Sequence, residues 1–216
     1  MNCSDESPCP IFLELTAAAS EGSHFFATGN IHSSSVTLFS VLLGSEDAGR
    51  EWQEISPRIR GASLDHLQFV DAAAGWAAGQ ELFPLPQEPF VLGTTDGGKN
   101  WTRHAVLADE AESRFGSILE FHFGSKMSGD LVIDRGQGSG AGRYARFESP
   151  SGGETWQIKE ESSKPLRVKA PPAEPVDWRV RADGASGSFQ LERRLGDRWI
   201  SRASFAVQIG ACKSPE

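Results

Sequence analysis

Thr94-Thr95-Asp96-Gly97-Gly98-Lys99-Asn100-Trp101 is the stretch that decides the fold. An Asp and two Gly between β-prone segments predict a tight turn, because the short acidic side chain can accept hydrogen bonds from nearby backbone N–H groups. Gly98 permits a positive φ without steric cost. Trp101 offers a large apolar surface that fixes the turn to its neighbours. We call this pattern the octet: a hydroxyl residue first, Asp third, Gly fifth and Trp eighth.

The octet recurs along the chain. Ser45, Asp47, Gly49 and Trp52 fill all four positions, as Thr94, Asp96, Gly98 and Trp101 do. A third copy has Ser in place of the Asp, and a fourth keeps only the Gly and the Trp; their residues are Ser149, Ser151, Gly153, Trp156, Gly196 and Trp199. The tryptophans recur at intervals of about 40–55 residues, which is typical of the blades of a β-propeller. Because Arg194 stands where the Asp belongs, we expect the fourth turn to be the loosest.

The octet resembles the Asp-box, or BNR repeat, Ser/Thr-x-Asp-x-Gly-x-x-Trp. Phe69-Val70-Asp71 and Gly75-Trp76-Ala77-Ala78-Gly79 precede the copy that ends at Trp101. With them, this copy is similar to the photosystem II stability/assembly factor-like propeller family. At motif level the similarity covers about residues 67–104. The resemblance implies a propeller and a structural role for the octet residues, but no particular activity.

We therefore expect one all-β domain over residues 10–212, with tails at 1–9 and 213–216. Abundant turn residues and the lack of a long apolar stripe of helical period favour short strands. We predict a closed propeller of four blades, each with four antiparallel strands, at about residues 10–57, 64–107, 117–161 and 166–210. A half-ring completed by another chain is the alternative.

Charge and hydropathy exclude some classes of partner. The net charge is −8 and the isoelectric point about 5.2, so the chain lacks the basic surface that nucleic acids require. No apolar run approaches the roughly 18 residues that span a bilayer. The chain opens with Met1-Asn2-Cys3-Ser4-Asp5, a polar stretch unlike a signal peptide, and we expect a mature or trimmed form with an added Met, from which a signal peptide has been removed.

The three cysteines lie at the two ends of the chain, at Cys3, Cys9 and Cys212. The first and last blades of a closed ring are neighbours, so we predict a disulfide between Cys9 and Cys212. A Cys3–Cys212 bridge and three free thiols are the alternatives. A bridge would place the protein in an oxidising compartment, either the periplasm or outside the cell.

Side chains with catalytic potential form no recognisable motif. Five histidines lack metal-ligand spacing: His24, His32, His66, His104 and His122. A sialidase would need an arginine cluster and a Tyr nucleophile, but the sole Tyr is Tyr144 and Ser56–Arg60 is a faint arginine motif. A paired-carboxylate glycosidase has four candidate residues, for which solvated strand-end positions are the expectation: Asp71, Glu120, Asp130 and Asp134. Trp76 is expected in a blade core, with an aromatic binding platform as the alternative. We predict no catalytic residue, cofactor or metal site.

The expected function is non-catalytic binding of a protein or another macromolecule outside the cytoplasm, by a monomer whose partner is a protein or a carbohydrate. The loops Leu82–Pro89 and Gly136–Gly142 are the expected contact points, because long propeller loops commonly bind. A glycoside hydrolase of sialidase-like fold is the alternative, and it requires two carboxylates about 5–10 Å apart. A purely structural module of a larger secreted protein is a third interpretation.

Overall fold

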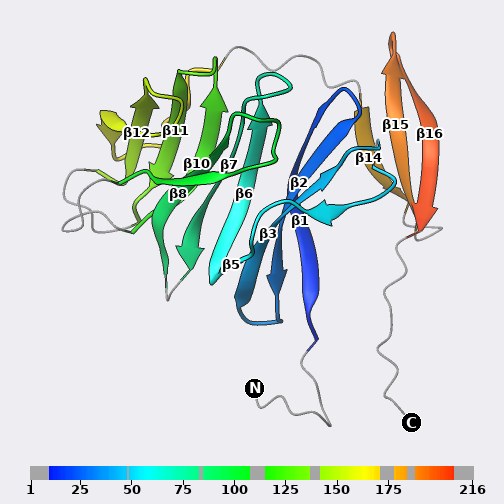
Figure 1. Ribbon diagram of the computed structural model, residues 1–216, viewed down its shortest axis with the longest axis horizontal. Coiled ribbons are helices and arrows are strands. Elements are labelled where there is room, and N and C mark those ends of the chain that lie inside the picture. Colours follow the sequence, from blue (N-terminus) through cyan, green and yellow to red (C-terminus); the bar gives the residue numbers. More distant parts are fainter. Residues whose placement is uncertain are drawn as a thin grey trace. The chain divides into compact units, whose positions relative to one another are not determined.

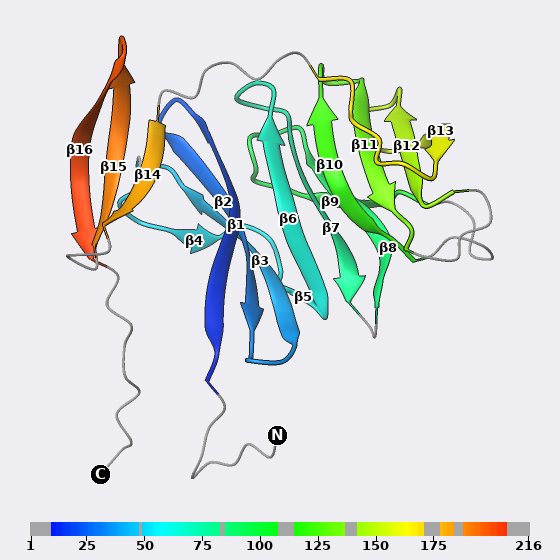
Figure 2. The ribbon, with the colours of Figure 1, turned by 180° about the vertical axis from the view of Figure 1, so that it is seen from behind.

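The computed structural model describes residues 10–47, 49–82, 85–107, 115–136, 142–170, 178–183 and 188–206. These residues form strands and turns, with no helix among them, and therefore no helix that could cross a membrane. The chain divides into two compact units, Met1–Ala170 and Pro171–Glu216, which are described separately. Figures 1 and 2 show the strands from two opposite sides.

The first unit contains three antiparallel sheets, each formed by consecutive strands. Sheet 1 contains β1 (Phe12–Glu21), β2 (His24–His32), β3 (Thr37–Ser45) and β4 (Gln53–Glu54) in that order, and β5 (Ile59–Arg60) also pairs with β3. Sheet 2 has the order β6 (Ala62–Phe69), β7 (Gly75–Leu82), β8 (Pro86–Thr94) and β9 (Thr102–Ala105). Sheet 3 has the order β10 (Ser117–Phe123), β11 (Gly129–Asp134), β12 (Tyr144–Ser149) and β13 (Gln157–Ser162). Such four-stranded meanders are the blades of β-propellers, and the predicted all-β fold class is confirmed.

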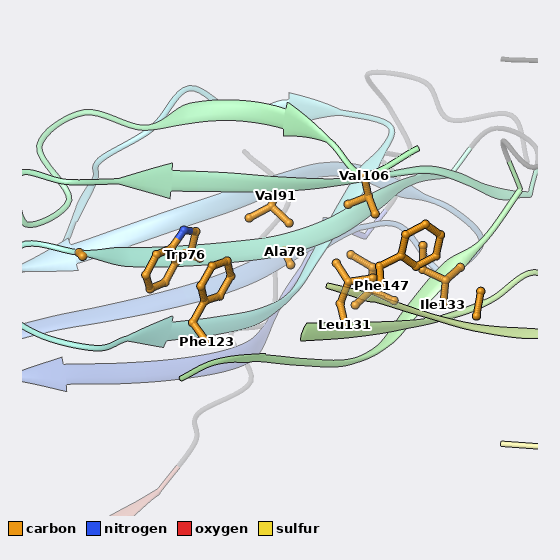
Figure 3. Packing of buried hydrophobic residues seen from close by; sticks show 11 residues of the cluster. Trp76, Ala78, Val91, Val106, Phe123, Leu131, Ile133 and Phe147 are labelled. Carbon is orange, nitrogen blue, oxygen red and sulfur yellow. The ribbon is translucent and has the colours of Figure 1, made fainter. Parts of the chain in front are cut away.

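Sheet 2 is buried on both faces. Successive side chains of a strand point to opposite faces, so Trp76 and Ala78 of β7 face sheet 3 while Ala77 between them faces sheet 1. Trp76 stacks on Phe123 of sheet 3 with ring centroids 3.7 Å apart, and Figure 3 shows the two rings side by side. The apolar run of β7 therefore reflects burial between two sheets. Trp76 is 3% exposed, which confirms its predicted place in the core.

Side chains also cross from one sheet to the backbone of the next. The Asn30 side-chain oxygen accepts the Leu64 N–H at 3.0 Å, and the Gln80 side-chain oxygen accepts the Ile118 N–H at 3.1 Å. Leu64 and Ile118 each stand just before a β-bulge, where the strand's own ladder is interrupted. Sheets 1 and 2 thus each bind a backbone N–H that a bulge in the next sheet leaves free.

The second unit is a three-stranded sheet in its described part, with the order β14 (Trp178–Asp183), β15 (Ser188–Leu195) and β16 (Arg198–Ala206). The predicted fourth blade begins at about residue 166, with Leu166–Lys169 as its first strand, but that part of the prediction is wrong, because this segment contains no strand. It runs past sheet 3, where the Glu120 carboxylate accepts the Val168 N–H at 2.9 Å and pairs with Arg167. Closure of the ring stays a prediction.

Candidate functional site

In the first three copies the octet residues form the same turn, at one end of sheets 1, 2 and 3. In the second copy the Thr94 hydroxyl accepts the Gly98 N–H at 3.0 Å, and the Asp96 carboxylate accepts the N–H groups of Lys99 and Asn100, each at 3.0 Å. The Trp101 indole N–H donates to the Gly98 carbonyl at 2.9 Å. The side-chain amide of Asn100 donates to the same carboxylate at 2.7 Å, and with these contacts it lowers the pKa of Asp96 to about 2.

The first and third copies make the same turn with different side chains. Ser45 accepts the Gly49 N–H at 2.9 Å, and Ser149 accepts the Gly153 N–H at 2.8 Å. Trp52 and Trp156 each donate to the carbonyl of the fifth residue of their octet at 3.0 Å. In the third copy the Ser151 hydroxyl replaces the carboxylate and accepts the Thr155 N–H at 2.9 Å.

The fourth copy is a different turn. Gly196 and Asp197 form a two-residue connection between β15 and β16, because Leu195 pairs directly with Arg198. Trp199 lies on β16 with the Arg179 guanidinium 4.3 Å from its ring centroid. Among the described residues, its indole N–H makes no bond like those that Trp52, Trp101 and Trp156 make to the fifth residue of their octets.

A groove of about 380 Å³ lies at the opposite end of sheets 2 and 3, away from the octet turns. Its lining residues come from the start of β8, the start of β10 and the end of β11: Leu85, Pro86, Phe115, Gly116, Ser117, Asp134, Arg135 and Gly136. We call it the Leu85–Phe115 groove. The side chains of Leu85 and Phe115 are 59% and 46% exposed, although both are large and apolar.

Two backbone contacts fix the apolar side of the groove. The Gly116 N–H donates to the Pro86 carbonyl at 2.9 Å, and Phe115 forms a β-bridge with Gln87. Beside the bridge, Glu88 has a φ of 47°, a left-handed conformation that is uncommon for a residue with a side chain. A bulge at this point lets β8 turn toward Phe115.

The polar side of the groove is an ion pair. Arg143 donates to both carboxylate oxygens of Asp134, with its Nη2 at 2.6 Å, and this lowers the pKa of Asp134. The Arg135 side chain is 6% exposed and pairs with Glu161 at 2.5 Å. The groove therefore combines exposed apolar side chains with charges that are already paired.

The predicted binding loops lie beside this groove. The segment Leu82–Pro89 is not the long loop expected, since β7 reaches Leu82 and β8 begins at Pro86. Proline is tolerated there because the strand is bulged. In the loop Gly136–Gly142, residues 137–141 lie outside the described part of the chain. Sequence reasoning missed Phe115, because its place beside Leu85 depends on pairing between distant segments.

Each of the four candidate carboxylates for a glycosidase forms an ion pair with a Lys or Arg side chain. Lys126 pairs with Asp71 at 2.8 Å and, with two backbone N–H groups, lowers the pKa of Asp71 to about 2. Asp130 pairs with Arg146 at 2.7 Å, and Glu120 with Arg167. Asp134 is bound by Arg143, so each of the four carboxylates is paired with a cationic side chain.

Other expected groups are distributed through the fold. The Tyr144 ring lies 5.1 Å from the Arg143 guanidinium, and Arg58 is bound to Glu54 at 2.6 Å. Among the described residues no cluster of three or more His, Cys, Asp or Glu side chains could hold a metal ion. Cys9 and Cys212, the predicted disulfide partners, lie outside the described residues, as does Cys3.

No family model matches the chain, and no curated protein matches its sequence. Solved structures match it at low identity. YCF48 bound to D1 peptide is 16% identical with a TM-score of 0.47, and the match covers 92% of this chain and 57% of that one. YCF48 from Cyanidioschyzon merolae is 18% identical with a TM-score of 0.47, over 90% of this chain and 57% of that one. A GH74 xyloglucanase from Xanthomonas campestris is 15% identical with a TM-score of 0.47, over 64% of this chain and 19% of that one. The chain thus spans little more than half the length of the YCF48 structures that it matches.

Proposed function

We propose that the chain is a non-catalytic binding module that recognises a protein partner through the Leu85–Phe115 groove, outside the cytoplasm. The observation that carries the proposal is the exposure of Leu85 and Phe115, 59% and 46%, on segments fixed by backbone pairing. Large apolar side chains held at a surface gain free energy when a partner covers them. A rigid backbone spares the partner the entropy of ordering a loop.

The shape and charge of the groove favour a protein over a small substrate. A volume of about 380 Å³ is near the lower limit for ligand pockets, and the groove is open to solvent. Its charged lining residues, Asp134 and Arg135, are already paired with Arg143 and Glu161, so they can orient a partner at the rim without being desolvated alone. The same pairing leaves no acid–base couple for hydrolysis in the groove.

Site-specific crosslinking tests this proposal. A photoreactive phenylalanine analogue at position 115 should crosslink to one partner protein in intact cells of the host. The matched control has the analogue at Met127, which is 59% exposed but lies between β10 and β11, at the octet end of sheet 3. Leu85→Asp should abolish crosslinking from position 115. Equal crosslinking from both positions would contradict the proposal, and fractionation of the crosslinked cells tests the extracytoplasmic location.

A further inference from the structure

A second, larger cavity lies between sheets 1 and 2 at the octet end of the first unit. Its volume is about 720 Å³, within the range of ligand sites. Phe26, Ile55 and the glycines Gly44 and Gly98 supply its apolar lining, and the octet turn that contains Gly97 supplies one wall. Phe26 is 5% exposed, so this lining belongs to the packed interior.

The interface between sheets 2 and 3 has a tryptophan at the position that corresponds to this cavity. There Trp76 stacks on Phe123, and its indole N–H donates to the Gly152 carbonyl at 2.7 Å. Gly152 is the fourth residue of its octet, as Gly97 is of the preceding one. Phe26 stands where Trp76 does, since it stacks on Phe69 with ring centroids 4.2 Å apart.

Glycine contacts support this equivalence. A Cβ atom on Gly98 would lie 2.8 Å from the Phe26 ring, and one on Gly153 would lie 3.4 Å from the Trp76 ring nitrogen. The interface between sheets 1 and 2 therefore lacks one hydrogen-bond donor that the interface between sheets 2 and 3 has, the indole N–H of Trp76. Phenylalanine has no N–H, so the Gly97 carbonyl accepts no hydrogen bond from any residue that the structure describes. A buried or half-buried carbonyl without a donor favours a ligand that brings one.

The charges around the cavity specify the donor further. Three carboxylates, Glu46, Glu54 and Asp96, line the cavity with one ammonium group, that of Lys99. Arg58 already binds Glu54 at 2.6 Å, and the Asp96 carboxylate already accepts backbone N–H groups of its own turn. Glu46 is exposed and makes no side-chain hydrogen bond or ion pair within the described part of the chain. A cationic donor would therefore find an unpaired carboxylate as well as a free carbonyl.

We propose that this cavity binds an arginine side chain of a partner peptide. The guanidinium has five N–H donors in a planar fork, so it can donate to the Gly97 carbonyl and pair with the Glu46 carboxylate together. Its aliphatic stem contacts Ile55 and the edge of Phe26. A neutral donor would bond to the Gly97 carbonyl but would not form an ion pair with the Glu46 carboxylate. This site is independent of the Leu85–Phe115 groove, which lies at the other end of the sheets.

Peptide titration followed by amide NMR tests the proposal. The probe is N-acetyl-Gly-Arg-Gly-amide, and its control is the same peptide with citrulline, which keeps the shape and loses the charge. The arginine peptide should shift the amide signals of Gly97, Gly98 and Ile55. Citrulline should bind about fivefold to tenfold more weakly, because a hydrogen bond to a charged group is stronger than a neutral one.

Variants assign the binding to this cavity. Glu46→Gln should lower the affinity for the arginine peptide about fivefold, because one charge-assisted contact is lost. Glu51→Gln removes the same charge from the same turn, but Glu51 does not line the cavity, so affinity should be unchanged. Phe26→Trp should abolish binding, because its indole N–H would take the Gly97 carbonyl. If that variant does not fold, the Glu46 and Glu51 pair decides. Equal binding of citrulline and arginine, or equal losses in Glu46→Gln and Glu51→Gln, would overturn the proposal.

Discussion

Replacing Trp76 by Phe measures how strongly the sheets of the first unit hold one another. The Trp76 side chain is buried, stacks on Phe123 and donates to the Gly152 carbonyl at 2.7 Å. Phenylalanine keeps part of the stacking and loses the hydrogen bond together with the rest of the indole. The change therefore converts this interface into the form that Phe26 gives to the interface between sheets 1 and 2.

The expected cost has three parts. The lost hydrogen bond accounts for about 1 kcal/mol. The smaller buried apolar surface adds about 1–1.5 kcal/mol, and the space left behind adds about 0.5–1 kcal/mol. We expect Trp76→Phe to lower the free energy of unfolding by about 3 kcal/mol, which for a domain of this size lowers Tm by about 6–12 °C.

Urea denaturation followed by circular dichroism measures this change, with Trp52→Phe as the matched control. Trp52 makes the same kind of bond to the Gly49 carbonyl at 3.0 Å, but its side chain is 44% exposed. Its replacement should cost about 1 kcal/mol or less, since little apolar surface is buried there. Equal losses in the two variants would refute the view that burial between sheets, and not the turn itself, stabilises the unit.

Three further predictions follow from other parts of the chain. Gly79→Ala should prevent folding of the first unit, because the new methyl group would lie 1.8 Å from a carbonyl oxygen of β6. The control is Gly124→Ala, whose methyl group would lie 4.0 Å from the nearest atom. This variant should leave the urea midpoint unchanged. The pKa of Asp96 is lowered from 3.8 to about 2, so its stabilising contribution is present above about pH 4 and is lost as the pH falls toward 2. Asp96→Asn should flatten this part of a plot of urea midpoint against pH. An unchanged slope would contradict the assignment of this pH dependence to Asp96. Peptide mapping without reductant should recover Cys9 linked to Cys212, and three free thiols would contradict the predicted bridge.

The parts of the fold that depend on local chemistry could be predicted from the sequence. A hydroxyl residue, a carboxylate and a glycine at octet spacing satisfy one another within eight residues, so Thr94, Asp96 and Gly98 identify their turn without tertiary information. The fourth copy shows the limit, because Gly196 and Trp199 keep the spacing while Glu192 replaces the hydroxyl residue and Arg194 replaces the Asp. The Glu192 carboxylate is bound by Arg179 and Arg181, and the chain forms a shorter hairpin.

The parts that depend on distant partners could not be predicted. Leu166–Lys169 alternates as a strand does, yet no described strand pairs with it, and its Val168 N–H is bound by the Glu120 carboxylate instead. The Leu85–Phe115 groove likewise requires the Gly116 N–H to reach the Pro86 carbonyl, a contact across 30 positions of sequence. Neither contact leaves a local pattern.

Apolar packing and hydrogen bonding play separate roles between the sheets. Burial of side chains such as Trp76 holds neighbouring sheets together, but this force has no direction and would tolerate a slide of one sheet along the other. The hydrogen bonds that cross between sheets have direction: Gln68 both accepts the Phe123 N–H at 2.7 Å and donates to the Phe123 carbonyl at 2.8 Å, and Gln80 accepts the Ile118 N–H. The two N–H groups that donate to the Gln side chains, those of Ile118 and Phe123, both lie on β10, so a slide by one residue would leave two buried N–H groups unpaired. The two amide side chains, with the Trp76 indole N–H that donates to the Gly152 carbonyl, therefore set the register between sheets 2 and 3, while burial of the aromatic core holds the two sheets together.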